Sequence, residues 1–272
     1  MRKYLRSFDG VKISYNISRI SDKFVVFLHG AGGNLTAWKK EQVFFKKKNV
    51  YTVAIDLRGH GNSSDPDKPS DYSLDNFAKD VYSVIKKEKI SDFILIGHCF
   101  GGMVSIMFHK LYPKMSKAYI LIDTTYKSPL SLSRIFRKHP FLENLINNIL
   151  DRRSLSKFSS ASQYKYAGTS DFNLRRIYSD ITSTGIKSWI FTYENISKFN
   201  SIDLLKKMNV PVLIIEGEKD SVFDVSVAKK IKNLIRGSKL SIIPGENHII
   251  VLSNPKVLEK EIYSFIKAIH FI

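Results

Sequence analysis

Six short apolar runs are the feature of this sequence that most restricts its fold. They have the length and composition of strands that are buried on both faces of a sheet. They occupy residues 24–28, 50–55, 93–96, 118–122, 211–215 and 239–243. Amphipathic stretches that are typical of helices lie between several of them, at 75–88, 100–112, 224–235 and 256–270. Strands that alternate with helices predict an α/β fold, with a mostly parallel sheet covered by helices on both faces.

Two other regions complete the expected architecture. Residues 2–18 contain the turn signal Asp9-Gly10 followed by alternating polarity, so we predict two antiparallel strands, which brings the sheet to eight strands. The segment 126–200 has no run that is typical of a buried strand, but it has helical patches at 129–138 and 140–150. We expect this segment to be an inserted helical cap within a single domain that spans residues 1–272.

Composition limits the class of protein. A chain of 272 residues, 43% of them hydrophobic, is long enough to bury one sizeable core. The sequence has no run of about eighteen apolar residues, so we expect no membrane-spanning helix. No apolar segment follows the basic N-terminus, so we expect no signal peptide. Cys99 is the single cysteine, which excludes an internal disulfide and makes a cytoplasmic location the simplest expectation.

The formal net charge of +18 is large and is spread along the whole chain. Such a charge attracts nucleic acids, anionic membranes or acidic substrates. No nucleic-acid-binding motif accompanies it, so we expect no nucleic-acid partner and favour a lysine-rich, solvated surface. A weak contact with an anionic membrane surface is compatible with the charge, and the sequence does not indicate an oligomeric state.

The string Gly97-His98-Cys99-Phe100-Gly101-Gly102 joins the apolar run 93–96 to the helical stretch 100–112. A nucleophile on a sharp turn between a strand and a helix needs small neighbours, and Gly97 and Gly101 let the backbone pass close by. The side chain of Cys99 then projects over the carboxyl edge of the sheet, where a helix N-terminus favours an anion. Cys99 is therefore our candidate nucleophile. The alternative is a buried structural cysteine in a glycine-rich turn.

Two more loops follow apolar runs near the N-terminus. The first reads HGAGGN at 29–34, and the second reads DLRGHGNSS at 56–64. A glycine-rich loop after a strand can bind phosphate, but neither a following Lys-Ser/Thr pair nor a G-x-G-x-x-G pattern is present, so we discount nucleotide binding. In the second loop we expect Asp56 and Arg58 to pair and brace the chain, and we expect His60 to be a packing residue.

Two late loops supply a candidate acid and a candidate base. Asp220 follows the run 211–215, and His248 follows the run 239–243. Because parallel strands end at the same edge of a sheet, these side chains are expected to meet Cys99 there. A base must contact the nucleophile, and an acid must hold the far nitrogen of the base. Asp123 and Asp224 are alternative acids. The remaining histidines are expected to hold loops or to pack: His29, His98, His109, His139 and His270.

Together these loops resemble those of the α/β-hydrolase family over about residues 8–270. The resemblance includes the nucleophile elbow, the His-Gly loop, the D-x-R-G-x-G-x-S loop and the order nucleophile, acid, histidine. It implies an eight-stranded α/β-hydrolase fold and a catalytic triad of Cys99, His248 and Asp220. It also implies an oxyanion hole formed by the backbone amides of Ala31 and Phe100. The resemblance implies neither a cofactor nor a metal.

The sequence departs from the family pattern at three positions. Cys99 replaces the usual serine, Asn247 stands where glycine often precedes the histidine, and Ser253 stands where an acid is common. A thiolate is a strong nucleophile at neutral pH, but sulfur is also a good leaving group. Activated acyl groups are therefore the expected substrates, namely thioesters, aryl or enol esters and lactones. Dienelactone hydrolases and polyhydroxyalkanoate synthases share a cysteine nucleophile, but this chain lacks the extra length of the synthases.

The expected function is hydrolysis of a small-molecule acyl substrate, as in esterases and thioesterases. An acyltransferase with the same triad and a ligand-binding receptor that keeps a hydrolase pocket are the alternatives. The expected cap would select the substrate. Its apolar and aromatic residues and its arginines predict an apolar acyl pocket with a basic rim. The alternative is that the apolar residues form the core of the cap itself and that the arginines are solvated. These residues are Phe136, Phe141, Leu145, Ile149, Tyr164, Tyr166, Trp189, Phe191, Arg134, Arg137, Arg152, Arg153, Arg175 and Arg176.

Overall fold

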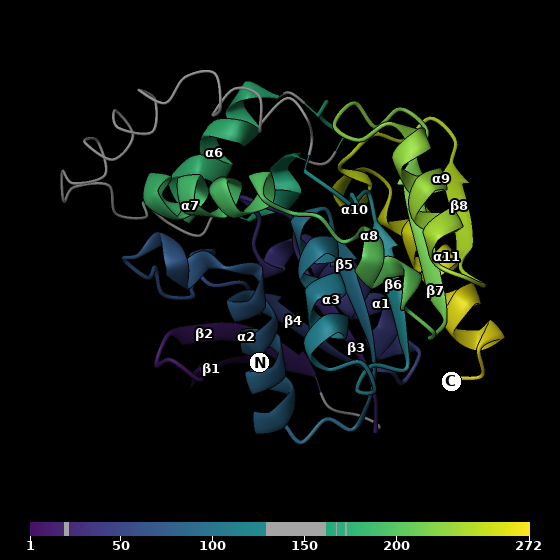
Figure 1. Cartoon of the computed structure of the whole chain (residues 1–272), viewed down its shortest axis with the longest axis horizontal. Helices are drawn as coiled ribbons and strands as arrows, with labels where there is room; N and C mark the ends of the chain where they lie inside the picture. The colour runs from purple at the N-terminus through teal and green to yellow at the C-terminus, as the bar shows by residue number, and fades with distance from the viewer. Residues whose placement is uncertain (19–21, 129–161, 167, 172) are drawn as a thin grey trace.

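An eight-stranded sheet forms the centre of the protein, as seen in a computed structural model of the chain (Figure 1). The structure describes residues 1–18, 22–128, 162–166, 168–171 and 173–272. The strand order is β1-β2-β4-β3-β5-β6-β7-β8, and β2 is antiparallel to both of its neighbours while all later pairs are parallel. The strands are β1 (Arg2–Arg6), β2 (Lys12–Ser18), β3 (Lys23–Leu28), β4 (Tyr51–Asp56), β5 (Asp92–His98), β6 (Ala118–Ile122), β7 (Val212–Gly217) and β8 (Lys239–Ile243). This sheet confirms the predicted fold class.

The middles of the central parallel strands are apolar because both faces of these strands are buried. In β3, Val26 and Leu28 belong to one core cluster, whereas Val25 and Phe27 belong to a second cluster on the other face. All four side chains are fully buried. Successive side chains of a strand point to opposite faces, so a strand between two helical layers must be hydrophobic at consecutive positions.

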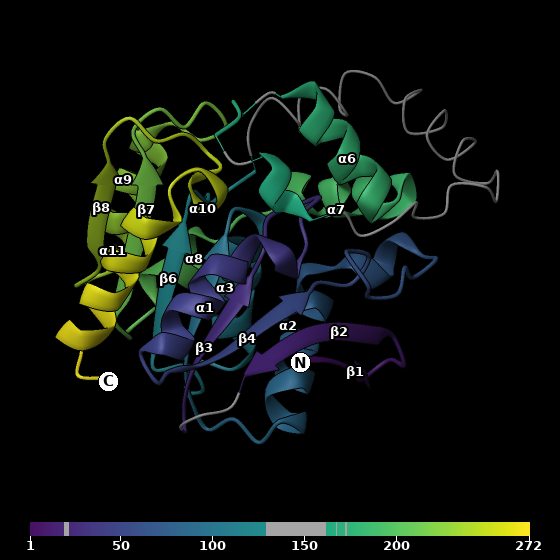
Figure 2. The same cartoon turned by 180° about the vertical axis from the view of Figure 1, so that it is seen from behind.

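Helices cover both faces of the sheet (Figures 1 and 2). One core cluster receives side chains from α1 (Lys39–Lys47), α10 (Ile250–Ser253) and α11 (Pro255–Ala268). The other receives side chains from α2 (Leu74–Lys87), α3 (Phe100–Leu111), α8 (Ile202–Lys206) and α9 (Val225–Leu234). The sequence pattern predicts α2, α3, α9 and α11 but not α1, because Val43 in α1 is 49% exposed and blurs its apolar face.

Helices α6 (Leu174–Thr184) and α7 (Ile186–Ser197) lie over the edge at which the parallel strands end (Figures 1 and 2). They belong to the region 126–200 for which we predict a cap. The two ends of that region lie side by side, because the N–H of Ser128 donates to the carbonyl of Phe199 at 2.7 Å and Ser201 N–H donates to Tyr126 at 2.9 Å.

Several of our predictions for this region concern residues that lie outside the described ones. These are the helical patches 129–138 and 140–150, the side chain of Tyr164, and Phe136, Phe141, Leu145, Ile149, Arg134, Arg137, Arg152, Arg153 and His139. In the described ranges, none of the helices combines the length and the hydropathy that crossing a membrane requires.

Candidate functional site

Cys99 occupies a strained turn between β5 and α3. Its backbone has φ 50° and ψ −112°, a conformation that a residue with a side chain rarely adopts. A Cβ at Gly97 would lie 2.2 Å from the carbonyl oxygen of Gly101, and a Cβ at Gly101 would lie 2.4 Å from that of Leu28. The hydroxyl of Thr124 donates to the carbonyl of Cys99 at 2.7 Å and helps to hold the turn. Glycine at both positions is therefore a steric requirement of this turn.

His248 and Asp220 reach Cys99 from the loops that follow β8 and β7. The Nδ1 atom of His248 lies 2.7 Å from Oδ2 of Asp220, and the Cys99 thiol is hydrogen-bonded to the same imidazole. The second carboxylate oxygen of Asp220 accepts the N–H groups of Val222 at 2.7 Å and Phe223 at 2.8 Å. The structure thus brings together the three residues predicted as nucleophile, base and acid.

The surroundings of His248 favour its protonated form, and those of Asp220 favour its ionised form. Burial alone would lower the pKa of His248, but the charge of Cys99 and the hydrogen bond with Asp220 raise it well above its usual value. Burial alone would raise the pKa of Asp220, but the hydrogen bonds from His248 and from two backbone N–H groups hold it below its usual value. A protonated imidazole held by the ionised carboxylate of Asp220 is the state that these two directions support.

His98 braces the same loop as a neutral imidazole. Burial, together with the charge of nearby His248, lowers the pKa of His98 to about 3. Its Nε2–H then donates to the carbonyl oxygen of His248 at 2.8 Å. The same nitrogen lies 3.9 Å from a carboxylate oxygen of Asp123, but a neutral ring makes no ion pair there. His98 therefore holds the base loop in place, as the sequence predicts for this histidine.

The two alternative acids have other partners. The Oδ1 atom of Asp224 accepts the N–H of Ser226 at 2.8 Å and caps the N-terminus of α9. Asp123 is fully buried, and its Oδ1 accepts the N–H of Gly217 at 2.9 Å. Of these three acids, Asp220 is the one whose carboxylate contacts Nδ1 of His248.

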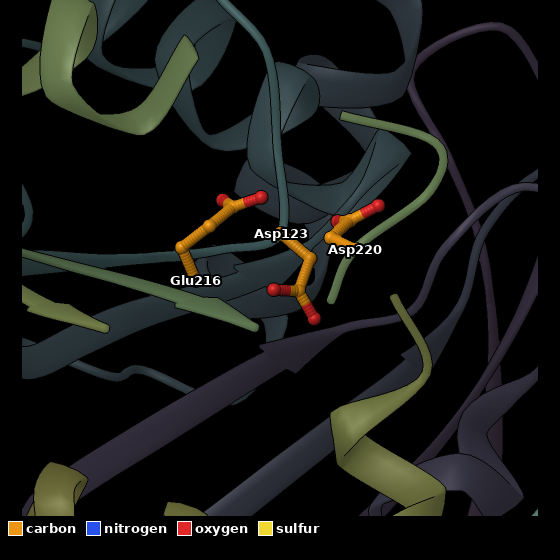
Figure 3. Close-up of side chains that lie close together, drawn as sticks. All are labelled: Asp123, Glu216 and Asp220. Carbon is orange, nitrogen blue, oxygen red and sulfur yellow. The ribbon is translucent and has the colours of Figure 1, made fainter. Parts of the chain in front are cut away.

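Asp220 belongs to a buried cluster of carboxyl groups with Asp123 and Glu216 (Figure 3). One oxygen of each residue lies within 4.8 Å of one oxygen of the other two. Burial, together with the neighbouring carboxyl groups of Asp123 and Asp220, raises the pKa of Glu216 to about 11. Burial likewise raises the pKa of Asp123 well above its usual value, and Asp220 adds to this. Glu216 is therefore a neutral acid near pH 7, and the pKa of Asp123 is shifted in the same direction.

Three carboxyl groups this close together could also bind a cation. Both oxygens of Asp220 already accept hydrogen bonds, from His248 on one side and from backbone N–H groups on the other. A cation would have to displace one of these donors. The geometry therefore disfavours a bound cation, and we assign no metal to the cluster.

The neutral state of Glu216 predicts a stability effect that depends on pH. A carboxyl group ionises near pH 4.5 in the unfolded chain but near pH 11 in the folded one, so the unfolded state gains from ionisation as the pH rises above about 4.5. Glu216→Gln removes this stabilisation of the unfolded state, because glutamine does not ionise. The difference in melting temperature between Glu216→Gln and the wild type is therefore expected to grow steadily in favour of the variant between pH 5 and pH 9.

Glu218→Gln is a matched control, because Glu218 lies two residues further along the chain, just after β7, and is exposed. Its melting temperature should follow that of the wild type at every pH. Calorimetry at pH 5, 7 and 9 makes both comparisons. A constant difference for Glu216→Gln across this range would show that Glu216 is ionised in the folded protein.

The backbone amides predicted for the oxyanion hole are both available. Phe100 is the first residue of α3, where an N–H has no acceptor within the helix. Ala31 lies in the loop after β3, and among the described residues neither of the two N–H groups has an acceptor. His29 holds this loop, since its Nδ1–H donates to the carbonyl of Gly30 at 2.8 Å and its Nε2 accepts the N–H of Leu57 at 3.1 Å.

The prediction that Asp56 and Arg58 pair with each other is wrong. Asp56 instead accepts the N–H groups of Leu35 at 2.8 Å and Asn62 at 3.0 Å. Arg58 is fully buried and makes a two-pronged pair with Asp80 of α2, with both distances at 2.7 Å. The planar guanidinium matches the two oxygens of Asp80, a partner that is remote in sequence. Both residues still brace the loop, but through separate contacts.

Sequence reasoning missed how closely Asp171, Asp180 and Thr184 contact the loops that follow β3 and β8. The side chain of Thr184 donates to the carbonyl of Gly32 at 3.2 Å, and a Cβ at Gly32 would lie 2.8 Å from the Cβ of Asp180. Asp171 accepts the N–H of His248 at 2.9 Å. No local pattern marks these polar residues, because their partners lie about 80 to 150 positions away in the sequence.

A cavity of about 40 Å³ lies between this segment and the loop after β3. Its lining includes Ala31, His98, Gln163, Arg176 and Asp180. Arg176 and Asp180 form an ion pair at 3.2 Å, so the side of the cavity formed by α6 is polar.

Helix α7 also lies near the nucleophile. Burial raises the pKa of Tyr193, and the charge of Cys99 contributes to the shift. Tyr193 packs on Trp189 with ring centroids 4.1 Å apart. Phe191, a third aromatic residue of the helix, is 5% exposed. The aromatic residues of α7 therefore combine internal packing with a position close to Cys99.

The chain is similar in sequence to known hydrolases. A sequence model of the alpha/beta hydrolase fold matches residues 23–255. The bifunctional esterase/perhydrolase of Acinetobacter calcoaceticus is 28% identical, over 97% of this chain and 99% of the relative. Mouse epoxide hydrolase 4 is 26% identical, over 89% of this chain and 72% of the relative.

Solved structures share the architecture at lower identity. A hydrolase from Pseudomonas aeruginosa superposes with a TM-score of 0.78 and 18% identity, over 97% of this chain and 98% of the other. The esterase RhEst1 from Rhodococcus has a TM-score of 0.73 and 22% identity, over 98% and 99%. The enol-lactonase from Burkholderia xenovorans has a TM-score of 0.75 and 18% identity, over 97% and 100%. At these identities the likeness shows a common fold.

Proposed function

Since the chain belongs to the alpha/beta hydrolase fold family, we propose that it hydrolyses a carboxylic ester, lactone or thioester through a covalent acyl-enzyme on Cys99. The observation that supports this most is the hydrogen-bonded series of Cys99, His248 and Asp220 at a strained elbow, with His248 and Asp220 2.7 Å apart. The esterase activity in the name of the Acinetobacter relative, which matches this chain over nearly its whole length, favours the same reaction type.

The reaction proceeds in two halves. The sulfur of Cys99 attacks the carbonyl carbon, and the carbonyl electron pair moves to the oxygen, where the N–H groups of Ala31 and Phe100 stabilise the negative charge. The imidazolium of His248 gives its proton to the leaving group as the bond to the acyl carbon breaks. His248 then takes a proton from water, which attacks the thioester and expels the Cys99 thiolate, releasing the carboxylic acid. Asp220 orients the imidazole throughout.

Activated acyl groups are the substrates that this site fits. An intermediate on sulfur reverts when the competing leaving group is a simple alkoxide, because the thiolate leaves more readily. We therefore assign aryl or enol esters, lactones and thioesters as the substrate class, with α6 and α7 acting as part of a cap over the nucleophile.

Turnover of a substrate panel tests the assignment. A short-chain p-nitrophenyl ester, a lactone, an acyl thioester and an alkyl ester are compared at one enzyme concentration, with product analysis in the presence and absence of alcohol and amine acceptors. We expect hydrolysis, with kcat/KM higher for the activated esters than for the alkyl ester. A product formed only with an acceptor would identify an acyltransferase, and binding without turnover would identify a receptor.

Alkylation provides an independent prediction about the nucleophile. Cys99 is the only cysteine and is partly exposed, so iodoacetamide should add a single alkyl group at this residue. Activity is expected to fall in proportion to the alkylated fraction, measured by intact-mass analysis and peptide mapping. Full activity of a completely alkylated sample would exclude Cys99 from the mechanism.

A further inference from the structure

One side chain in the segment before α6 contacts both loops that hold His248 and Asp220. Asp171 is 6% exposed, and its Oδ1 accepts the N–H of His248 at 2.9 Å. Its Oδ2 accepts the N–H of Ser221 at 3.0 Å and the hydroxyl of Ser221 at 2.5 Å. Ser221 directly follows Asp220 in the chain. Arg176 of α6 donates to the main-chain carbonyl of Asp171, which ties this residue to the helix.

The distance between base and acid depends on how two separate loops are held together. One link is a backbone hydrogen bond from Lys219 to the carbonyl of Glu246 at 2.7 Å. The segment before α6 supplies a second link through Asp171, and Asn247 donates to the carbonyl of Thr169 in the same segment at 3.1 Å. A buried carboxyl group that accepts three hydrogen bonds is costly to disturb, because its loss leaves the buried N–H of His248 without an acceptor. Asp171 is therefore suited to fix the spacing of the loops.

We propose that Asp171 is a positioning residue that holds the backbone of His248 and Ser221, so that the imidazole stays aligned between Cys99 and Asp220. The inference rests on the proposed function of these residues. Asp171 acts through the backbone and does not itself exchange a proton with the substrate. Because it belongs to the segment that leads into α6, it couples the position of that helix to the alignment of the catalytic base.

Steady-state kinetics of Asp171→Ala provide the first test. We expect kcat to fall about tenfold to a hundredfold, because a displacement of about 1 Å in a catalytic group can cost about a hundredfold in rate. KM should change by less than about threefold, since Asp171 has no proposed contact with the substrate. Asp224→Ala is the matched control, because Asp224 is an exposed acid close to the same loop that caps α9. The control should keep the wild-type kcat.

The rate at which iodoacetamide alkylates Cys99, measured at pH 6 and at pH 9, reports on the alignment of the His248 imidazole independently of turnover. An aligned imidazolium supports the thiolate at low pH, so the ratio of the rate at pH 6 to the rate at pH 9 should fall in Asp171→Ala. A loss of general stability alone would not change this ratio. The titratable groups that face His248 are Cys99, Asp220, His98, Asp123, Glu216 and Asp171, and all of them except Asp171 itself are unchanged in the variant.

Ser221→Ala keeps the test decisive if Asp171→Ala does not fold. This variant removes one hydrogen bond and leaves the backbone bonds to Asp171 in place, so the rate ratio should move in the same direction by a smaller amount. Wild-type kcat and an unchanged rate ratio in the folded variants would overturn the inference. If the wild type turned over no acyl substrate while the ratio still fell in Asp171→Ala, the proposed function would fail and the positioning role would stand.

Discussion

Replacing His248 with alanine is expected to lower kcat by about ten-thousandfold to a millionfold, the range seen when a triad loses its base. The imidazole is the only described group that is hydrogen-bonded to both the Cys99 thiol and the Asp220 carboxylate. Its loss removes the proton acceptor for the attacking water and the proton donor for the leaving group. Stopped-flow and steady-state assays on a p-nitrophenyl ester measure the effect, and His270→Ala, at an exposed position, is the control.

The acid assignment is tested in the same assay. Asp220→Asn is expected to lower kcat by about ten-thousandfold, because an amide that donates to Nδ1 favours the wrong tautomer of the base. Asp123→Asn keeps an oxygen that can accept the N–H of Gly217 and does not touch the contact between His248 and Asp220, so its effect on kcat should be small. A nearly silent Asp220→Asn together with an inactive Asp123→Asn would reverse the two roles.

Cys99→Ser is expected to produce the second large effect, a loss of kcat/KM that is greatest on activated esters. The exchange keeps the elbow and the hydrogen-bond donor but replaces sulfur by oxygen. A hydroxyl is hardly ionised at neutral pH and needs full general-base help from His248 during attack, whereas a thiolate attacks directly. Thioesters and aryl esters need the least help with the leaving group, so the difference between the two nucleophiles is greatest for them.

The opposite result has a specific meaning. If the site is built for serine and cysteine merely occupies its place, Cys99→Ser will be far more active, above all on alkyl esters, where sulfur is expelled too readily. The measurement is kcat/KM of both forms on an aryl ester and a matched alkyl ester. A gain of a hundredfold or more on both substrates would exclude a thiol-dependent mechanism. The positions of His248, Asp220 and the two oxyanion amides would be unaffected by that outcome.

The sequence by itself determined the sheet, the elbow and the approximate place of the site. Continuous apolar runs such as 24–28 specify strands that are buried on both faces, because burial on each face forbids polar residues at alternate positions. Gly97 and Gly101 mark a turn that no larger side chain would fit, which is information carried by adjacent residues. Cys99, Asp220 and His248 each follow such a run, and the common edge of a parallel sheet gathers them whatever the details of packing.

Only the tertiary structure decided which polar groups pair across the molecule. Arg58 bonds to Asp80 and not to Asp56, and Asp171 bonds to His248 across 77 positions. The neutral state of Glu216 likewise depends on its burial beside Asp123 and Asp220. A charged side chain can meet any complementary group that the fold brings within about 3 Å, so its partner is set by geometry and burial and leaves no periodic signal in the sequence.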